Sequence, residues 1–330
     1  MDGIDIRDNA VSGDEAIKKV IDAQSRLKKL KQENAALRRD RDDLLLEHED
    51  LRNARRVVPF TPGSGTRRRR DRIRVAFGDM HGMRMDRKAV EALLNDIGRL
   101  KPDEIVLGGD MLEGGGFFAT HHVLGYVANC DYTYQEDVEA TNWFLDELQK
   151  AAPNAQVYYL EGNHEDRIER WVVDETMGRQ RDAEFLLNLV GPRTLLRIGD
   201  RNITYIRRSD KTEEGLPYGW LKLGKMFFAH EISGGKNAAA RALAMTAGNV
   251  TCFHTHQESS ATLELTAVGI VKAFCPGCLC EKQPLWRHSN PTNWNHGYCI
   301  DVIAPSGNFQ HIQVPFHNGE SLGCALLDRR

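Results

Sequence analysis

The stretch Val250–His256 constrains the chain most, because an apolar and β-branched run ends there in two histidines, His254 and His256. Alternate side chains of a strand share one face, so a strand at this position would point both imidazoles to the same side. Earlier apolar runs end in similar polar residues, namely Asp79 and His81, Asp110, Asn163 and His164, and His230. Such groups at several strand ends are what a site for two metal ions needs.

The pattern upstream of these histidines predicts alternating strands and helices. We expect strands at 73–77, 104–107 and 156–160, and helices at 86–100 and 136–150. This order favours parallel strands joined by right-handed crossovers. Ligands of such sheets bind beyond the carboxyl ends of the strands, where the polar residues fall.

The second half is predicted to be richer in strands. Residues 166–190 are expected to be helical and to cap the site, and 194–207 to form a hairpin that turns at 200–202. Strands are expected at 225–229 and 249–253 on either side of a helix at 237–247, and again near 261–265, 268–274, 298–303 and 309–314. A second sheet packed on the first is therefore expected.

Composition is that of a soluble, intracellular protein. Charged residues make up 28% of the chain and mean hydropathy is -0.48. No apolar run approaches the roughly 20 residues that a membrane span needs, and the N-terminus lacks the features of a signal peptide. Seven cysteines, an odd count, fit a reducing compartment, so we expect a cytoplasmic location.

Residues 14–56 contain neither proline nor glycine and are expected to form one long helix. Leucine recurs every seven residues, at Leu30, Leu37, Leu44 and Leu51, and Asn34 occupies the complementary heptad position. This repeat predicts a coiled-coil homodimer, so residues 1–56 are taken as an N-terminal coiled-coil helix. The alternative is an amphipathic helix folded back on the globular domain.

Residues 57–72 are predicted to be a flexible linker that leads into a globular domain at 73–330. Pro59, Pro62 and the neighbouring glycines break regular structure. Four consecutive arginines, Arg67, Arg68, Arg69 and Arg70, could bind the phosphates of a nucleic acid. A solvated joint is slightly favoured, because no aromatic residues are interleaved for base stacking.

The predicted ligands combine oxygen and imidazole donors, which suit Mn, Fe, Zn or Ni better than Ca or Mg. Two such ions about 3.5–4 Å apart would hold a hydroxide between them and clamp a phosphate for in-line displacement. A structural zinc at Cys275, Cys278 and Cys280, with His288, His296 and Cys299 nearby, is the less favoured interpretation of that segment.

The order Asp-x-His, Gly-Asp, Gly-Asn-His-Glu, His and His-x-His resembles the calcineurin-like metallophosphoesterase superfamily, and His230–Lys236 resembles its phage and bacterial branches. The resemblance implies an α/β fold, a two-sheet β-sandwich flanked by helices, with a bimetal centre. It implies Asp79, His81 and His256 as ligands of the first metal, Asp110 as the bridge, and Asn163, His230 and His254 as ligands of the second. Manganese is the metal we expect first.

The resemblance also implies that His164 contacts the phosphate and protonates the leaving oxygen. Glu165 is expected to orient a ligand imidazole from behind. Phe253 stands where the family usually has glycine, so we expect its side chain to narrow the site or tilt His254.

Two further cations are candidate substrate-binding residues. Lys236 follows two glycines at a helix start, and Arg167 follows the Gly-Asn-His-Glu motif. Both could bind a phosphate. For Lys236 a solvated charge at the helix start is an equally good interpretation, and for Arg167 a solvated charge on the helix surface is the better one.

These observations predict a metal-dependent phosphodiesterase that acts on a nucleic acid or nucleotide. The alternative is a phosphomonoesterase that acts on nucleotides or phosphoproteins. A non-catalytic scaffold or nucleic-acid-binding module is a third possibility.

Overall fold

The computed structural model describes residues 71–115, 132–284 and 291–321, together with Arg26, Lys29 and residues 31–33. The chain divides into two units, residues 1–67 and 68–330. The described residues of the first unit are helical and exposed, and Lys29 Nζ lies 3.9 Å from Glu33 Oε1. The heptad leucines, the arginine run and the histidines 121, 122 and 288 lie outside the described residues.

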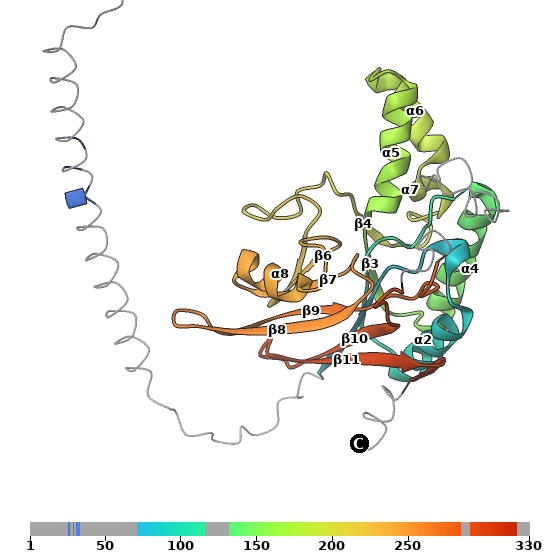
Figure 1. Cartoon of the computed structure of the whole chain (residues 1–330). Helices are drawn as coiled ribbons and strands as arrows, with labels where there is room; N and C mark the ends of the chain where they lie inside the picture. Colours follow the sequence, from blue (N-terminus) through green and yellow to red (C-terminus); the bar gives the residue numbers. More distant parts are fainter. Residues whose placement is uncertain are drawn as a thin grey trace, which may run out of the picture. The chain divides into compact units, whose positions relative to one another are not determined.

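The larger sheet has seven strands (Figure 1). In spatial order they are β12 (Glu320–Ser321), β11 (Phe309–His317), β10 (Gly297–Ile303), β1 (Arg72–Phe77), β2 (Glu104–Leu107), β3 (Gln156–Leu160) and β4 (Thr204–Ile206). Strands β1 to β4 run parallel, and β10 pairs antiparallel with β1. The carboxyl ends of β1, β2 and β3 therefore meet at one edge of the sheet.

The smaller sheet has five strands and packs against the first. Its order is β5 (Leu221–Leu223), β6 (Met226–Ala229), β7 (Asn249–Cys252), β9 (Gly269–Pro276) and β8 (Glu258–Leu265), with β6, β7 and β9 parallel. Buried side chains from both sheets fill the space between them, including Val106, Leu160, Phe228, Phe253 and Phe274. This inter-sheet core confirms the predicted sandwich.

Helices cover the outer faces of both sheets (Figure 1). Helices α2 (Arg87–Leu100) and α4 (Tyr134–Ala151) bury their apolar sides on the larger sheet, and α8 (Ala238–Thr246) lies on the smaller one. Helix α4 begins two residues before the predicted start, because Thr133 and Glu136 form a capping box. No helix in the described part of the chain has the length and apolar character needed to cross a membrane.

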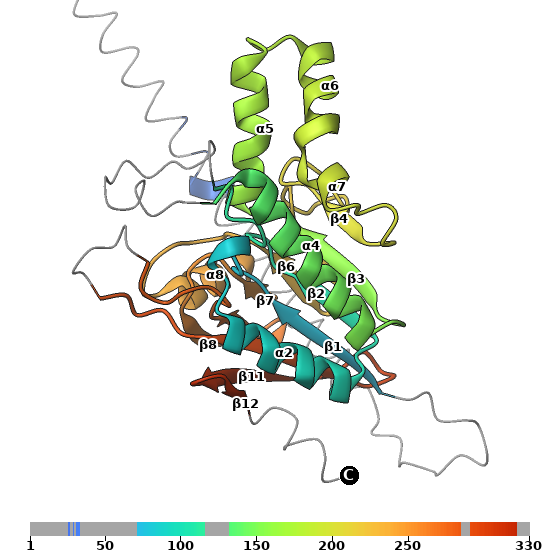
Figure 2. The same cartoon turned by 90° about the vertical axis from the view of Figure 1, so that its right-hand side faces the viewer.

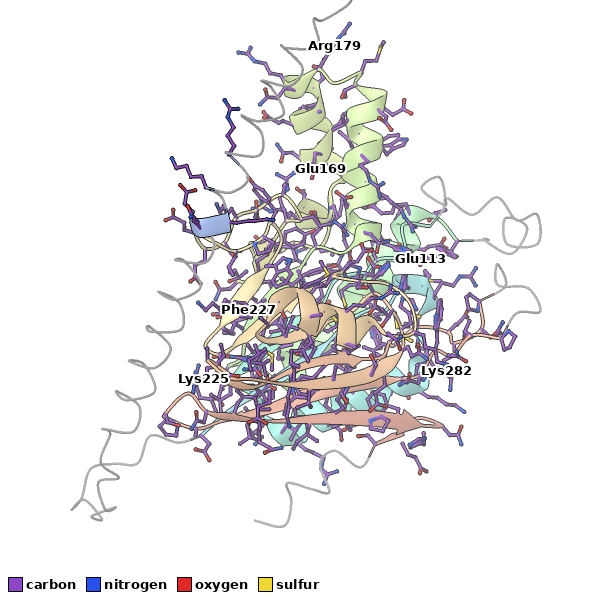
Figure 3. The ribbon with its side chains drawn as sticks, turned by 60° about the vertical axis from the view of Figure 1, so that its left-hand side comes forward. Glu113, Glu169, Arg179, Lys225, Phe227 and Lys282 are labelled. Atoms are coloured by element: carbon purple, nitrogen blue, oxygen red, sulfur yellow. The ribbon has the colours of Figure 1, made fainter. Side chains whose placement is uncertain are left out.

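The helical segment predicted at 166–190 is two helices, α5 (Asn163–Glu175) and α6 (Gln180–Val190). The chain turns between them where Met177 and Gly178 adopt positive φ angles of 53° and 72°. The two helices form a hairpin that projects from the body of the domain, with Arg179 at its outer end (Figures 2 and 3). Only the start of α5 borders the predicted site, so the expected cap is wrong.

The hairpin predicted at 194–207 is also wrong. Pro192 starts a short helix, α7 (Pro192–Leu195), because its fixed φ suits the first helical position. Strand β4 then pairs in parallel with β3 as the edge of the larger sheet. The turn expected at 200–202 is present, but it lies between α7 and β4. The buried Arg201 guanidinium holds it to α4, 2.6 Å from Asp146 and 3.0 Å from Gln149.

Phe253 does not enter the predicted site. Its side chain is 2% exposed and lies in the inter-sheet core against Gly108 and Gly78. A Cβ atom at Gly108 would stand 2.3 Å from Phe253 Cγ, so the ring fits only because that residue lacks a side chain. The expectation that Phe253 narrows the site is therefore wrong.

Gly108→Ala is expected to lower the free energy of unfolding by about 1–3 kcal/mol, the typical cost of overpacking a core. Gly98→Ala is the matched control, because a Cβ atom there meets nothing within 4 Å in helix α2. That control should be neutral or slightly stabilising, since alanine is the better helix former. Urea denaturation of both variants measures the difference, and equal stabilities would contradict this account of Phe253.

Candidate metal centre

Each predicted metal ligand follows the carboxyl end of a strand. Asp79 and His81 follow β1, Asp110 follows β2, Asn163 follows β3, His230 follows β6, and His254 and His256 follow β7. Three of these strands belong to the larger sheet and two to the smaller one. The site therefore lies where the parallel strands of both sheets end, as expected for an α/β fold.

Most of these ligands sit on left-handed backbone. Positive φ angles occur at Asp79 (54°), His81 (58°), Asp110 (50°), His254 (69°) and His256 (57°). The two histidines were predicted to share a strand face. Strand β7 ends at Cys252, before either of them, so that prediction is wrong and these turns direct their side chains. Such conformations are uncommon outside glycine and gather at functional sites, where the surrounding structure maintains them.

A first cluster is centred on His256. Its Nε2 atom lies 3.1 Å from His81 Nε2 and 3.4 Å from Asp79 Oδ1. His81 Nδ1 donates to Glu113 Oε2 at 2.6 Å, so its Nε2 atom is the nitrogen left to face the cluster. Carboxylate contacts of this kind commonly fix the tautomer of a metal-binding histidine.

A second cluster is centred on His230. Its Nε2 atom lies 3.0 Å from Asn163 Oδ1 and 3.3 Å from Asp110 Oδ2, while its Nδ1 atom donates to the Gly108 carbonyl at 2.8 Å. Ligand atoms of His254, His230 and Asp110 all lie within 4.8 Å of one another. The structure thus brings all the predicted ligands into two adjoining clusters.

The spacing of these atoms fits metal ions. Ligands at roughly 2.0–2.1 Å from an ion in tetrahedral or octahedral geometry are themselves about 2.9–3.4 Å apart. The measured separations around His256 and His230 run from 3.0 to 3.4 Å. The residues therefore fit a pair of divalent cations, and their ligand roles and the metal's identity stay predictions.

The buried charges of the two clusters shift one another's pKa values. Burial opposes protonation of His230, but the charge and hydrogen bond of Asp110, together with the Asp79 carboxylate and the Gly108 carbonyl, raise the pKa of His230 to about 9. Burial likewise opposes protonation of His81, and Glu113 raises the pKa of that imidazole to about 9. Burial alone would raise the pKa of Asp110, yet His230 keeps it well below its usual range. The clusters are thus anionic pockets that attract positive charge.

Glu165 holds the backbone beneath these clusters. Its buried carboxylate accepts hydrogen bonds from the amides of Gly162, Asp110, Met111 and Leu112 at 2.8–3.1 Å, and from the Tyr159 hydroxyl at 2.7 Å. The residue was expected to orient an imidazole, but these partners belong to the loops that carry Asp110 and Asn163. Glu165 therefore joins the ends of β2 and β3.

Glu113 and Asp137 were missed by the sequence analysis. The Asp137 carboxylate, at the start of α4, accepts hydrogen bonds from the amides of Met83, Glu113 and Gly114 at 2.9–3.1 Å. It therefore joins the loops after β1 and β2. A Cβ atom at Gly82 would lie 1.8 Å from Asp137 Oδ1, so the approach requires glycine. The one sequence signal was the placement of Glu113 three residues after Asp110.

His164 and Arg167 lie together at the start of α5. His164 Nδ1 donates to the Glu113 carbonyl at 2.6 Å, and Arg167 Nη2 lies 3.0 Å from His164 Nε2. That Nε2 atom is 3.8 Å from Asp110 Oδ2. Burial is the main cause that lowers the pKa of His164 to about 4. The Nε2 edge and the guanidinium both border the cluster around Asp110.

Of the other candidates, Lys236, Cys275 and Cys278 lie apart from this centre, whereas Cys280 lines its cavity beside His81 and His256. Lys236 is exposed in the turn before α8 and is not among the residues that line the cavity of the site. Cys275 Sγ lies 3.1 Å from Cys252 Sγ, Cys278 Sγ donates to the Asn295 carbonyl, and Cys280 Sγ lies 3.6 Å from His256 Nδ1. Because their contacts differ, these cysteines do not form the zinc site considered above within the described residues.

A cavity of about 190 Å³ opens over the two clusters, and its wall includes His164, Arg167, Arg84, Glu281, Pro284 and Trp294. A larger cavity of about 500 Å³ lies between α5, α6, α7 and β4. Its acidic lining includes Glu161, whose pKa burial raises to about 7, and Glu169, which Figure 3 shows on α5. The smaller cavity is the candidate site, because five of the predicted ligands line it, namely His81, Asp110, Asn163, His254 and His256.

The sequence matches the model of the calcineurin-like phosphoesterase family over residues 74–260, more than half of the chain. The chain therefore belongs to this family. It is a metallophosphoesterase, a hydrolase that acts on phosphate esters.

Solved structures with a similar arrangement include YfcE, a phosphoesterase from E. coli, with 15% identity, 73% of this chain and 98% of that chain covered, and a TM-score of 0.33. A single mutant of Vps29 from Entamoeba histolytica has 12% identity, with 74% of this chain and 99% of that chain covered and a TM-score of 0.32. Vacuolar protein sorting 29 from Cryptosporidium parvum has 9% identity, with 77% of this chain and 95% of that chain covered and a TM-score of 0.36. Comparison with curated proteins gives no match.

Glu113→Gln is expected to weaken Mn²⁺ binding about 10- to 100-fold, because the amide removes the charge that orients His81. Titration calorimetry on protein freed of metal measures the affinity. Glu281→Gln is the matched control, since Glu281 lines the same cavity but pairs with Arg84 Nη1 at 3.5 Å. An equal loss in both variants would contradict a specific role for Glu113.

Proposed function

We propose that this metallophosphoesterase is a phosphodiesterase that acts on nucleic acids or nucleotides. The observation that supports it is the charge around the cavity. Asp110, Glu113 and Glu281 contribute carboxylates to its wall, against the guanidinium groups of Arg84 and Arg167. Arg84 already faces Glu281. The two cations would face either ester alike, so the side chains make the difference. Their small excess of positive charge suits a phosphodiester, which carries one negative charge, better than a monoester dianion.

Two divalent ions at such a centre supply Lewis acidity and lower the pKa of water. Asp79, His81, Asp110, Asn163, His230, His254 and His256 would hold them. The remaining groups belong to the chain itself. His164 presents its Nε2 edge to the cavity, because its Nδ1 atom donates to the Glu113 carbonyl.

We assign His164 the proton that passes to the leaving oxygen. Its pKa is low because it is buried, and a phosphate bound within hydrogen-bond distance would favour the charged form. Arg167 shares that edge and can donate to a phosphate oxygen from the same side. Lys236 is exposed, so we propose no contact with the scissile phosphate for it.

Hydrolysis of bis-(p-nitrophenyl) phosphate with Mn²⁺ is expected to exceed that of p-nitrophenyl phosphate in kcat/KM. Release of p-nitrophenolate measures both reactions. Asp110→Asn is expected to remove at least about two orders of magnitude of the diester activity, since this carboxylate adjoins both clusters and positions charge at the reacting phosphate.

A preference for the monoester would favour the alternative, a phosphomonoesterase acting on nucleotides or phosphoproteins. Full activity of Asp110→Asn would contradict the proposed centre. Absence of hydrolysis of either ester by the parent protein would favour the scaffold or nucleic-acid-binding module instead. Circular dichroism of the variant checks that the fold is retained.

We further propose that residues 14–56 form a homodimeric coiled coil, with residues 57–72 as a linker to the catalytic domain at 73–330. The strict leucine repeat supports the dimer, and the arginines 67–70 would bring added affinity for a nucleic acid. The described helical residues of this segment, including Lys29 and Glu33, are exposed and compatible with either a dimer or a single helix.

Replacing Leu37 and Leu44 together by lysine is expected to halve the mass in solution, because charges at the seam oppose pairing. Multi-angle light scattering measures the mass. Gln32→Lys, at an exposed helical residue, is the matched control and should leave the mass unchanged. Deletion of residues 1–56 should also give a monomer, and an unchanged mass would contradict the dimer.

A further inference from the structure

Trp294 occupies a fixed position beside the first cluster. Its ring centroid lies 4.0 Å from that of His256, with the planes tilted by 57°. The same imidazole faces His81 and Asp79 through its Nε2 atom. Only the His256 imidazole therefore lies between the indole and the predicted metal position.

The segment that carries Trp294 is anchored on both sides. The Asn295 amide donates to the His256 carbonyl at 3.0 Å, and the Asn295 carbonyl accepts from the Cys278 amide at 2.9 Å. Thr292 Oγ1 donates to the Lys282 carbonyl, and its amide donates to Gln283 Oε1 at 3.0 Å. A rigidly placed aromatic ring loses little entropy when a ligand packs on it.

The two sides of the cavity differ in chemistry. His164 and Arg167 supply polar groups from α5, whereas Trp294 and Pro284 supply apolar surface from the segment before β10, beside the ion pair of Glu281 and Arg84. A phosphate held at the clusters would thus have a proton donor on one side and an apolar wall on the other. The leaving group belongs with His164. In an in-line displacement the attacking oxygen lies opposite the leaving oxygen, and the group that stays esterified lies off that axis, where the apolar surface of Trp294 and Pro284 can receive it.

We propose that Trp294 and Pro284 form a subsite for a nucleobase carried by the retained half of a phosphodiester. The inference rests on the proposed function and names the substrate class within it. An indole offers a flat apolar face that stacks on any base. The cavity of about 190 Å³ is smaller than the roughly 300–1,000 Å³ of sites that enclose whole ligands. It therefore takes the phosphate and one ring, while the rest of the chain of a nucleic acid extends outside.

The test compares two diesters with the same leaving group, thymidine 5′-(p-nitrophenyl) phosphate and methyl p-nitrophenyl phosphate. In the Mn²⁺-loaded full chain, Trp294→Ala should lower the ratio of their kcat/KM values about 5- to 100-fold, the range expected when a base loses its aromatic stacking partner. The loss should appear mainly as a higher KM for the thymidine ester. Trp294→Phe should restore most of the ratio.

Trp143→Ala is the matched control, because Trp143 lies on α4 under the Arg87 guanidinium and does not line the cavity. It should leave the ratio unchanged. An equal fall of both substrates in Trp294→Ala would show that the indole only supports His256, and an unchanged ratio would also overturn the subsite. If the parent protein hydrolyses neither diester, the proposed function itself fails.

Discussion

The arrangement of the site depends on one buried carboxylate, that of Glu165. Its oxygens gather the amides of two loops that follow β2 and β3, and with them the Tyr159 hydroxyl. A buried charge is stable only when several donors satisfy it, so the loops and the carboxylate require one another. Asp137 does the same for the loops after β1 and β2. These two side chains let Asp79, His81 and Asp110 keep left-handed backbone angles that isolated chains would avoid.

Much of the fold followed from the sequence, because its strongest signals are local. Strands β2 and β3 have the predicted bounds, and α2 has an Asp86 cap where the pattern placed a helix start. The order of strands and helices implied parallel pairing, which in turn brought distant polar residues to one edge. Polar residues at strand ends were therefore sufficient to identify the members of both clusters.

The remaining features depend on contacts between distant residues. The segment around Arg201 forms the turn that its composition predicts, but a short helix and not a strand precedes it, and the buried guanidinium holds it against α4. The break between α5 and α6 is different, because Gly178 beside Met177 was a local turn signal that the predicted continuous helical segment passed over. Asp137 acts through backbone amides, which leave no mark in the sequence, and Glu113 acts through the imidazole of His81, 32 residues away. The strand expected at 249–253 ends at Cys252, and left-handed turns, not strand alternation, direct both histidines.

The packing of the Phe253 ring against Gly108 restricts which substitutions the chain tolerates at these two positions. The Phe253 ring, just after β7, fills the space that a side chain at Gly108, just after β2, would otherwise occupy. Shrinking the ring first would leave a hole, whereas enlarging the glycine first would force two atoms into the same space. Any drift in one of these positions is therefore tied to the other, although they lie on different sheets and far apart along the chain. The two positions are therefore expected to vary together. A larger residue in place of Gly108, which the structure cannot accommodate alone, fits when a smaller residue replaces Phe253.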